Sequence, residues 1–353
     1  MPHNLLKHSS ILFLSTVTAN GLAYLLHIFL ARTLGPASYG ELGSLLAFLA
    51  ILLVPLAVLL NVIAKFAARF QSRSEEGKIG SLMFSSIRKL SLYSVAGLAL
   101  ISMLSPFIAD FLHLASPLPV VLIGLTTAFF SFLAVSQGIL YGTQRFGSLA
   151  LNQFLENLFR LILVILLVIV GLGINGALLG HALSLLAVFL VSLFLLKDYR
   201  HKRDANISLK EMRHYALHVF IVAISITALI DGPTLFVKHF YSAELTGYWN
   251  ASLNLARLIL LFGSAVSGAM FGKVAFSAVD TIKRKIFWES LAYVVLFSLT
   301  ASVVFFLFSE EILILFFGPL YAGGADLLRW MGFAVSTIGL IHVSLTYRLG
   351  AMS

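Results

Sequence analysis

Long apolar runs recur at even spacing along the whole chain. Runs such as 45–60 and 161–170 are continuously apolar and do not alternate, which is typical of spanning helices and not of barrel strands. A helix that crosses a bilayer needs about 20 apolar residues. We therefore expect an all-α integral membrane protein with about ten transmembrane helices, placed at 10–31, 42–64, 90–109, 118–140, 157–173, 175–196, 215–237, 248–272, 288–308 and 327–347.

The composition supports this expectation. The 353 residues are 59% hydrophobic and 11% charged, whereas soluble domains average about 45–50% and 25%. This balance excludes a soluble enzyme, a disordered chain and a secreted disulfide scaffold. The chain has no cysteine, and the nearest approach to a phosphate-binding loop, at 268–273, has the wrong glycine spacing. We expect no cofactor, no metal site and no catalytic residue.

Lys and Arg are unevenly divided between the two sides that the expected helices define. Of the 24, 20 fall on the side that holds the N-terminus, and the other four are Arg32, Lys238, Arg257 and Arg329. Basic residues collect on the cytoplasmic side of membrane proteins. The distribution predicts a multi-pass protein of the cell (inner or plasma) membrane, in contact with membrane lipids, with a cytoplasmic N-terminus. It explains the net charge of +9 without a nucleic-acid partner.

The longest polar stretch separates six expected helices from four. Residues 197–214 are interpreted as a basic cytoplasmic linker beside anionic lipid headgroups. We expect an N-terminal six-helix lobe at 1–196 and a C-terminal lobe at 215–353. The segment LGPASYGELG (34–43) corresponds to YSAELTGYWNA (241–251), which indicates two pseudo-symmetric bundles, a common transporter plan. Because the second bundle has only four helices, we expect it to be incomplete, with a truncated sequence or a naturally short family member as the two explanations.

Three segments carry a resemblance to a known family. They are 30–69 (LARTLGPASYGELGSLLAFLAILLVPLAVLLNVIAKFAAR), the turn with Glu244, Gly247 and Tyr248, and 316–332 (FFGPLYAGGADLLRWMG). Together they resemble the polysaccharide biosynthesis and export flippases of O-antigen, teichoic-acid and capsule type. These proteins belong to the multidrug/oligosaccharidyl-lipid/polysaccharide exporter superfamily. Members usually have 12 or 14 spans, and this chain departs from that number.

The resemblance implies a transporter and not an enzyme. A flippase of this family moves an undecaprenyl-diphosphate-linked oligosaccharide, such as an O-antigen unit, across the cytoplasmic membrane by alternating access. Its expected partners are the lipid-linked oligosaccharide and a coupling H⁺ or Na⁺. Two alternatives stay open: a cation-coupled antiporter of small amphipathic compounds from the same superfamily, and a membrane-embedded glycan-transferring enzyme.

Charged residues inside spanning helices mark candidate sites, because a charge in hydrocarbon is costly. Asp231 precedes Gly232-Pro233, where the proline frees backbone carbonyls, and is the expected ion-coupling residue. Arg257 is expected at a similar depth, as a switchable partner of Asp231 or as a ligand of the diphosphate. The alternative is a fixed buried Asp231–Arg257 pair that neutralises itself.

Four other residues are candidates for substrate binding. Arg32 and Lys238 occupy equivalent outer ends of two repeat-related helices, where they are expected to bind the diphosphate or to extend to the lipid headgroups. Asn20 and Asn61 are expected to contact sugar or to form hydrogen bonds between helices.

Glu156 and Arg160 lie one helical turn apart at the expected cytoplasmic start of the helix 157–173. This spacing predicts an i,i+4 ion pair. The functional alternative is a cytoplasmic gate or a headgroup site.

Overall fold

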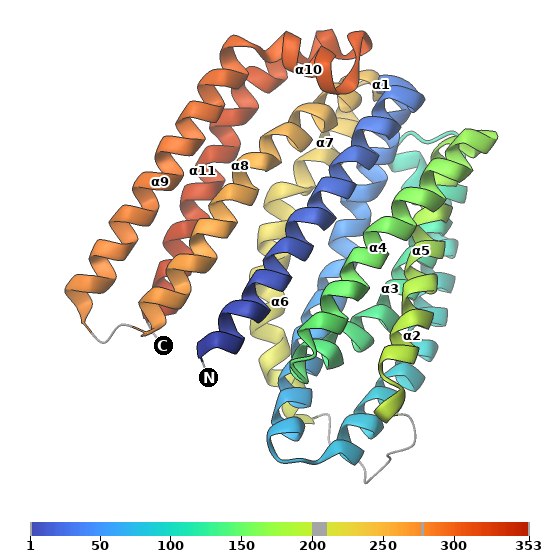
Figure 1. Cartoon of the computed structure of the whole chain (residues 1–353). Coiled ribbons are helices and arrows are strands. Elements are labelled where there is room, and N and C mark those ends of the chain that lie inside the picture. The colour runs from blue at the N-terminus through green and yellow to red at the C-terminus, as the bar shows by residue number, and fades with distance from the viewer. Residues whose placement is uncertain (1, 200–209, 277–278, 352–353) are drawn as a thin grey trace. The chain divides into compact units, whose positions relative to one another are not determined.

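The computed structural model describes residues 2–199, 210–276 and 279–351, and over these residues the chain is helical, without a strand (Figure 1). The α-helices are α1 (Pro2–Ser72), α2 (Glu76–Phe111), α3 (Leu118–Gly142), α4 (Phe146–Leu167), α5 (Gly173–Leu195), α6 (Lys210–Ile230), α7 (Gly232–Phe240), α8 (Ala243–Phe276), α9 (Asp280–Leu307), α10 (Ser309–Phe317) and α11 (Ala325–Ala351). Three short turns join them: η1 (Val168–Leu172), η2 (Lys197–Tyr199) and η3 (Pro319–Gly324). The all-α expectation is confirmed.

In the described chain, 7 helical stretches are long and apolar enough to cross a membrane. Two of them, Val17–Ser72 and Phe146–Leu195, have 56 and 50 residues, more than twice the roughly 20 that one span needs. Gly35, with a φ of 74°, interrupts the first, and Gly171, with a φ of 98°, interrupts the second. Figure 1 shows the chain reversing at both places. Each stretch therefore supplies two antiparallel spans, and with the pair α6–α7 they match the expected number.

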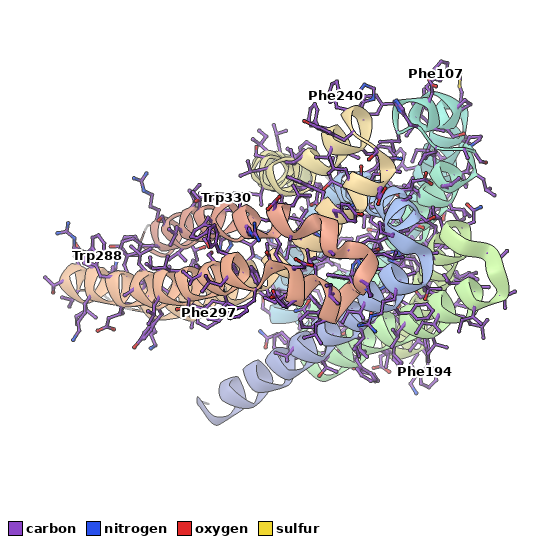
Figure 2. The ribbon with its side chains drawn as sticks, turned by 90° about the horizontal axis from the view of Figure 1, so that it is seen from above. Phe107, Phe194, Phe240, Trp288, Phe297 and Trp330 are labelled. Carbon is purple, nitrogen blue, oxygen red and sulfur yellow. The ribbon has the colours of Figure 1, made fainter. Side chains whose placement is uncertain are left out.

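Large apolar side chains lie on the outside of the helices. Phe107, Phe194 and Phe240 are strongly exposed, and so are Trp288 and Trp330. Figure 2 shows these side chains directed away from the ribbons that carry them. Apolar surface of this extent is unsuited to water. It suits a bilayer, in which helices satisfy their backbone hydrogen bonds internally, so the chain is a multi-pass membrane protein.

The chain divides into two compact units. The N-terminal unit comprises Met1–Leu34 and Glu41–Tyr241, and the C-terminal unit comprises Gly35–Gly40 and Ser242–Ser353. The pair α6–α7 thus belongs to the N-terminal unit, whereas the expected linker at 197–214 places it in the second lobe. Residues 200–209 of that linker lie outside the described residues. The division into lobes expected from the sequence stays a prediction.

Each unit has its own apolar core. In the N-terminal unit the second arm of α1 packs with α2 and α3 through the fully buried Ile63, Ile79 and Ile139. In the C-terminal unit α8, α9 and α11 pack around Val294 and Val343, which are also fully buried. These cores hold the helices that carry the candidate site residues.

Candidate functional site

A cavity of about 160 Å³ lies inside the N-terminal unit, between both arms of α1 and the helices α4 and α5. Most of its lining is aliphatic. The polar exceptions are His27 of α1, Arg160 of α4 and His181 of α5. Three basic side chains from three helices therefore line one small, otherwise apolar space.

The close approach of α4 and α5 brings two of these side chains together. A Cβ atom on Gly180 would lie 2.8 Å from the Cα of Val164, which leaves no room for a side chain there. The π-helical turn η1 ends α4, and Gly171 and Gly173, with φ of 98° and 52°, reverse the chain into α5. As a result Arg160 and His181 line the same cavity.

A buried polar network lies beside this cavity. The Nε2 of Gln137 donates hydrogen bonds to Oδ1 of Asn152 at 3.1 Å and to Oε2 of Glu156 at 2.9 Å. The Nη2 of Arg160 donates to Oδ1 of Asn157. Among the described residues, the buried Nε of Arg160 has no hydrogen-bond partner. The network satisfies Glu156 but leaves one donor of Arg160 available.

The structure corrects the expected position of Glu156 and Arg160. The helix was predicted to start at 157, but α4 begins at Phe146, so both residues lie in the middle of the helix instead of at its start. The prediction was wrong because hydropathy counts polar residues against a span, although here they are hydrogen-bonded within the bundle. Glu156 accepts from Gln137 and Arg160 donates to Asn157, and the charges of Glu156 and Arg160 attract each other. The gate assigned to Glu156 and Arg160 stays a prediction.

Asp231-Gly232-Pro233 forms the junction between α6 and α7, inside the segment 215–237 that was expected to be one span. Pro233 stands in the first turn of α7, where its missing N–H leaves no intrahelical bond unmade. The half-buried Asp231 accepts a backbone hydrogen bond from Thr234 at 3.1 Å. Asp231 belongs to the N-terminal unit and Arg257 to the C-terminal unit. Their pairing and the ion-coupling role of Asp231 stay predictions.

The two outer cations, Arg32 and Lys238, have different environments. Lys238 of α7 is buried, with its Nζ 3.8 Å from Oε1 of Glu41 on the second arm of α1. Arg32 is exposed near the end of the first arm, three residues before Gly35. The repeat therefore matches their places along the sequence but not their burial, because Lys238 is buried and Arg32 is exposed. Substrate binding by either residue stays a prediction.

The remaining candidates are less enclosed. Asn20 is half-buried on the first arm of α1. Asn61 is exposed, and its Nδ2 donates to the carbonyl of Ala57 at 3.1 Å, within its own helix and not between helices. Arg257 is half-buried on α8, one turn after Asn254, whose Nδ2 donates to the hydroxyl of Tyr39 at 2.8 Å. Contact of Asn20, Asn61 or Arg257 with substrate stays a prediction.

The three family-like segments meet in the C-terminal unit. The Tyr39 ring centroid lies 6.1 Å from that of Tyr321 and 6.2 Å from that of Phe317. The Tyr248 centroid lies 6.2 Å from that of Tyr321. Tyr39 and Tyr321 are almost fully buried. This aromatic cluster was missed from the sequence, since the resemblance named its residues without showing that they are neighbours.

Two glycines of these segments form a close backbone contact. A Cβ on Gly40 would lie 2.6 Å from the backbone N of Gly247, and one on Gly247 would lie 2.0 Å from the carbonyl oxygen of Pro36. Neither position accepts a side chain without a backbone shift. The pairs Tyr39-Gly40 and Gly247-Tyr248, one in each of the two corresponding segments, therefore have a packing role inside the C-terminal unit.

Comparison with known proteins places these features in context. The family model described as polysaccharide biosynthesis protein matches residues 5–276. An uncharacterized membrane protein of Methanocaldococcus jannaschii is 26% identical over 368 residues, which cover 97% of this chain and 83% of the relative.

Solved transporter structures share the fold. The lipid II flippase MurJ in an inward closed conformation matches with a TM-score of 0.71 and 16% identity, covering 97% of this chain and 76% of that structure. An inward-facing multidrug resistance MATE family transporter of the MOP superfamily matches with a TM-score of 0.67 and 16% identity, covering 94% and 83%. At this level of identity the likeness concerns the fold alone.

Proposed function

Because the chain belongs to the polysaccharide biosynthesis protein family, we propose that it is a flippase for an undecaprenyl-diphosphate-linked oligosaccharide. It moves this substrate from the cytoplasmic to the outer leaflet of the cell membrane by alternating access, and its N-terminus is cytoplasmic. The glycan is of the kind assembled for surface polysaccharides such as O-antigen.

The observation that carries the proposal is the extent of the family match. Residues 5–276 run from α1 to the end of α8. Every candidate substrate, coupling and gate residue named from the sequence lies in that range. The match to the family therefore covers the part of the chain that holds the intramembrane polar chemistry.

The contacts of the described residues suit an anionic substrate. A diphosphate carries negative charge and is bound by Arg and Lys through charge-assisted hydrogen bonds. In the proposed cycle Lys238 exchanges its partner Glu41 for the diphosphate, while Arg32 and Arg257 bind the same group at other stages. Asp231, at the helix break, binds H⁺ or Na⁺ and resets the carrier.

Complementation of a strain that lacks its lipid-linked oligosaccharide flippase tests the proposal. We expect the full chain to restore surface glycan, and Asp231→Ala and Arg257→Ala to abolish the rescue. Arg88→Ala, which removes an exposed basic residue of α2, is the matched control and should rescue fully.

The same strain separates the alternatives. A drug antiporter confers resistance to toxic amphipathic compounds without restoring surface glycan. A glycan-transferring enzyme consumes its donor in detergent, without a bilayer. Either result, or full rescue by both the Asp231 and the Arg257 variant at normal expression, would contradict the proposed mechanism.

A further inference from the structure

The cavity in the N-terminal unit contains chemistry that the proposed path does not use. We infer that this cavity, which His27 also lines, is a binding site for a phosphate-type oxyanion, with Arg160 supplying the charge and His181 a further hydrogen-bond donor. The anion is a free phosphate or diphosphate, or the diphosphate of a polyprenyl lipid. Only the lipid source rests on the proposed function.

The first argument is charge. An arginine stays protonated in any protein environment, and a buried charge needs a partner of opposite sign. None of the described residues that line the cavity is acidic. Glu156, one turn away on the same helix, accepts its hydrogen bond from Gln137 and is not part of the lining. Glu156 attracts Arg160 electrostatically, but it lies outside the lining, so the described cavity wall carries a positive charge and no acid.

The second argument is the unpaired donor. The Nε of Arg160 is buried and has no hydrogen-bond partner among the described residues, an arrangement that costs free energy unless a ligand completes it. The Nη2 is already held by Asn157, which fixes the orientation of the guanidinium. A planar guanidinium fits two oxygens of a phosphate group. Its remaining donors are therefore suited to an oxyanion.

The third argument is size and composition. The cavity has a volume of about 160 Å³, which is enough for phosphoryl groups. The imidazole of His181 offers an N–H donor in either protonation state. Metal ions and amphipathic cations are disfavoured because Arg160 repels them.

Direct binding to the purified full chain in lipid nanodiscs tests the inference, with inorganic diphosphate as the probe and calorimetry as the readout. We expect saturable binding by the unaltered protein. Arg160→Gln should weaken it at least about tenfold, which corresponds to about 1.4 kcal/mol. Arg160→Lys should retain part of the affinity. Arg88→Gln, which removes an exposed cation, should bind like the unaltered protein.

A second variant guards against misfolding of the first. If Arg160→Gln does not yield a monodisperse protein, His181→Leu, which removes the N–H donor, should weaken binding while α4 is left intact. A folded, unaltered protein that binds no diphosphate would overturn the inference. So would a folded Arg160→Gln or His181→Leu variant that binds like the unaltered protein.

Competition by a short-chain polyprenyl diphosphate distinguishes the two sources of the anion. Displacement of inorganic diphosphate identifies the lipid headgroup as a ligand of the site, and undisturbed binding identifies the free anion; both support an oxyanion site. If diphosphate binds but the chain fails to rescue the flippase-deficient strain, the proposed function is wrong and the oxyanion site is supported. If rescue succeeds without diphosphate binding, the oxyanion site is wrong and the proposed function is supported.

Discussion

The Nζ of Lys238 lies 3.8 Å from Oε1 of Glu41, so that one ion pair joins α7 to the second arm of α1. The Lys238 side chain is 3% exposed and that of Glu41 is 27% exposed. The separation exceeds the roughly 2.7–2.9 Å of a charge-assisted hydrogen bond. Lys238 is thus a buried cation whose acid in this pair is partly solvated and beyond hydrogen-bond distance. A competing anion can replace an acid that is bound this weakly.

Neutralising Glu41 leaves the buried Lys238 without its acid. Glu41→Gln should lower the free energy of unfolding by about 2 kcal/mol, which is less than the roughly 3–5 kcal/mol of a fully buried pair because Glu41 is partly solvated. Thermal unfolding in detergent measures the effect. The double variant Glu41→Gln/Lys238→Met should lose about 1 kcal/mol less than the two single variants together. If the losses of unfolding free energy in the two single variants simply add up in the double variant, Glu41 and Lys238 do not interact.

The close contact at Gly247 predicts that any side chain added there would clash with a neighbouring backbone and lower stability. Because its added Cβ would meet the carbonyl oxygen of Pro36 at 2.0 Å, Gly247→Ala should destabilise the protein by about 3 kcal/mol or prevent folding. Gly268→Ala on the same helix is the control, since nothing lies within 4 Å of its added Cβ. Expression and melting temperature in detergent compare the two. Equal tolerance of both substitutions would rule out the predicted contact.

The amide of Gln137, which bridges two buried acceptors, is predicted to stabilise the fold. Gln137→Ala removes the donor to both Asn152 and Glu156 and leaves buried acceptors unsatisfied, so it should lower stability by about 2 kcal/mol. Asn61→Ala, at an exposed position bonded only within its own helix, should change stability by less than about 0.5 kcal/mol. Chemical unfolding in detergent measures both. Similar losses at the two positions would show that the network is not stabilising.

Much of the fold follows from the sequence, because a spanning helix requires little more than a long apolar run. The helix break at Asp231 was not predicted, because the run 215–237 reads as one span. Pro233 stands in the first turn of α7, where proline is favoured. The two reversals inside the long apolar stretches were expected, since each stretch is too long for one span.

The candidate site was less predictable, because it depends on contacts between helices. The polar run with Asn152, Glu156 and Arg160 reads as the end of a loop, yet it lies inside α4, where Gln137 of α3 donates to Asn152 and Glu156. The cavity escaped prediction because His27 and His181 are isolated along the chain. Only the packing of three helices brings them to Arg160.

Translocation in proteoliposomes tests the proposed function most directly. The purified chain is reconstituted with a polyprenyl-diphosphate-linked oligosaccharide in the inner leaflet, and a membrane-impermeant glycosidase reports the glycan that reaches the outside. We predict protein-dependent release that is lost in Asp231→Asn and retained in Arg88→Gln. Release no faster than from protein-free liposomes, with folded protein present, would contradict the assignment of this chain as a lipid-linked oligosaccharide flippase.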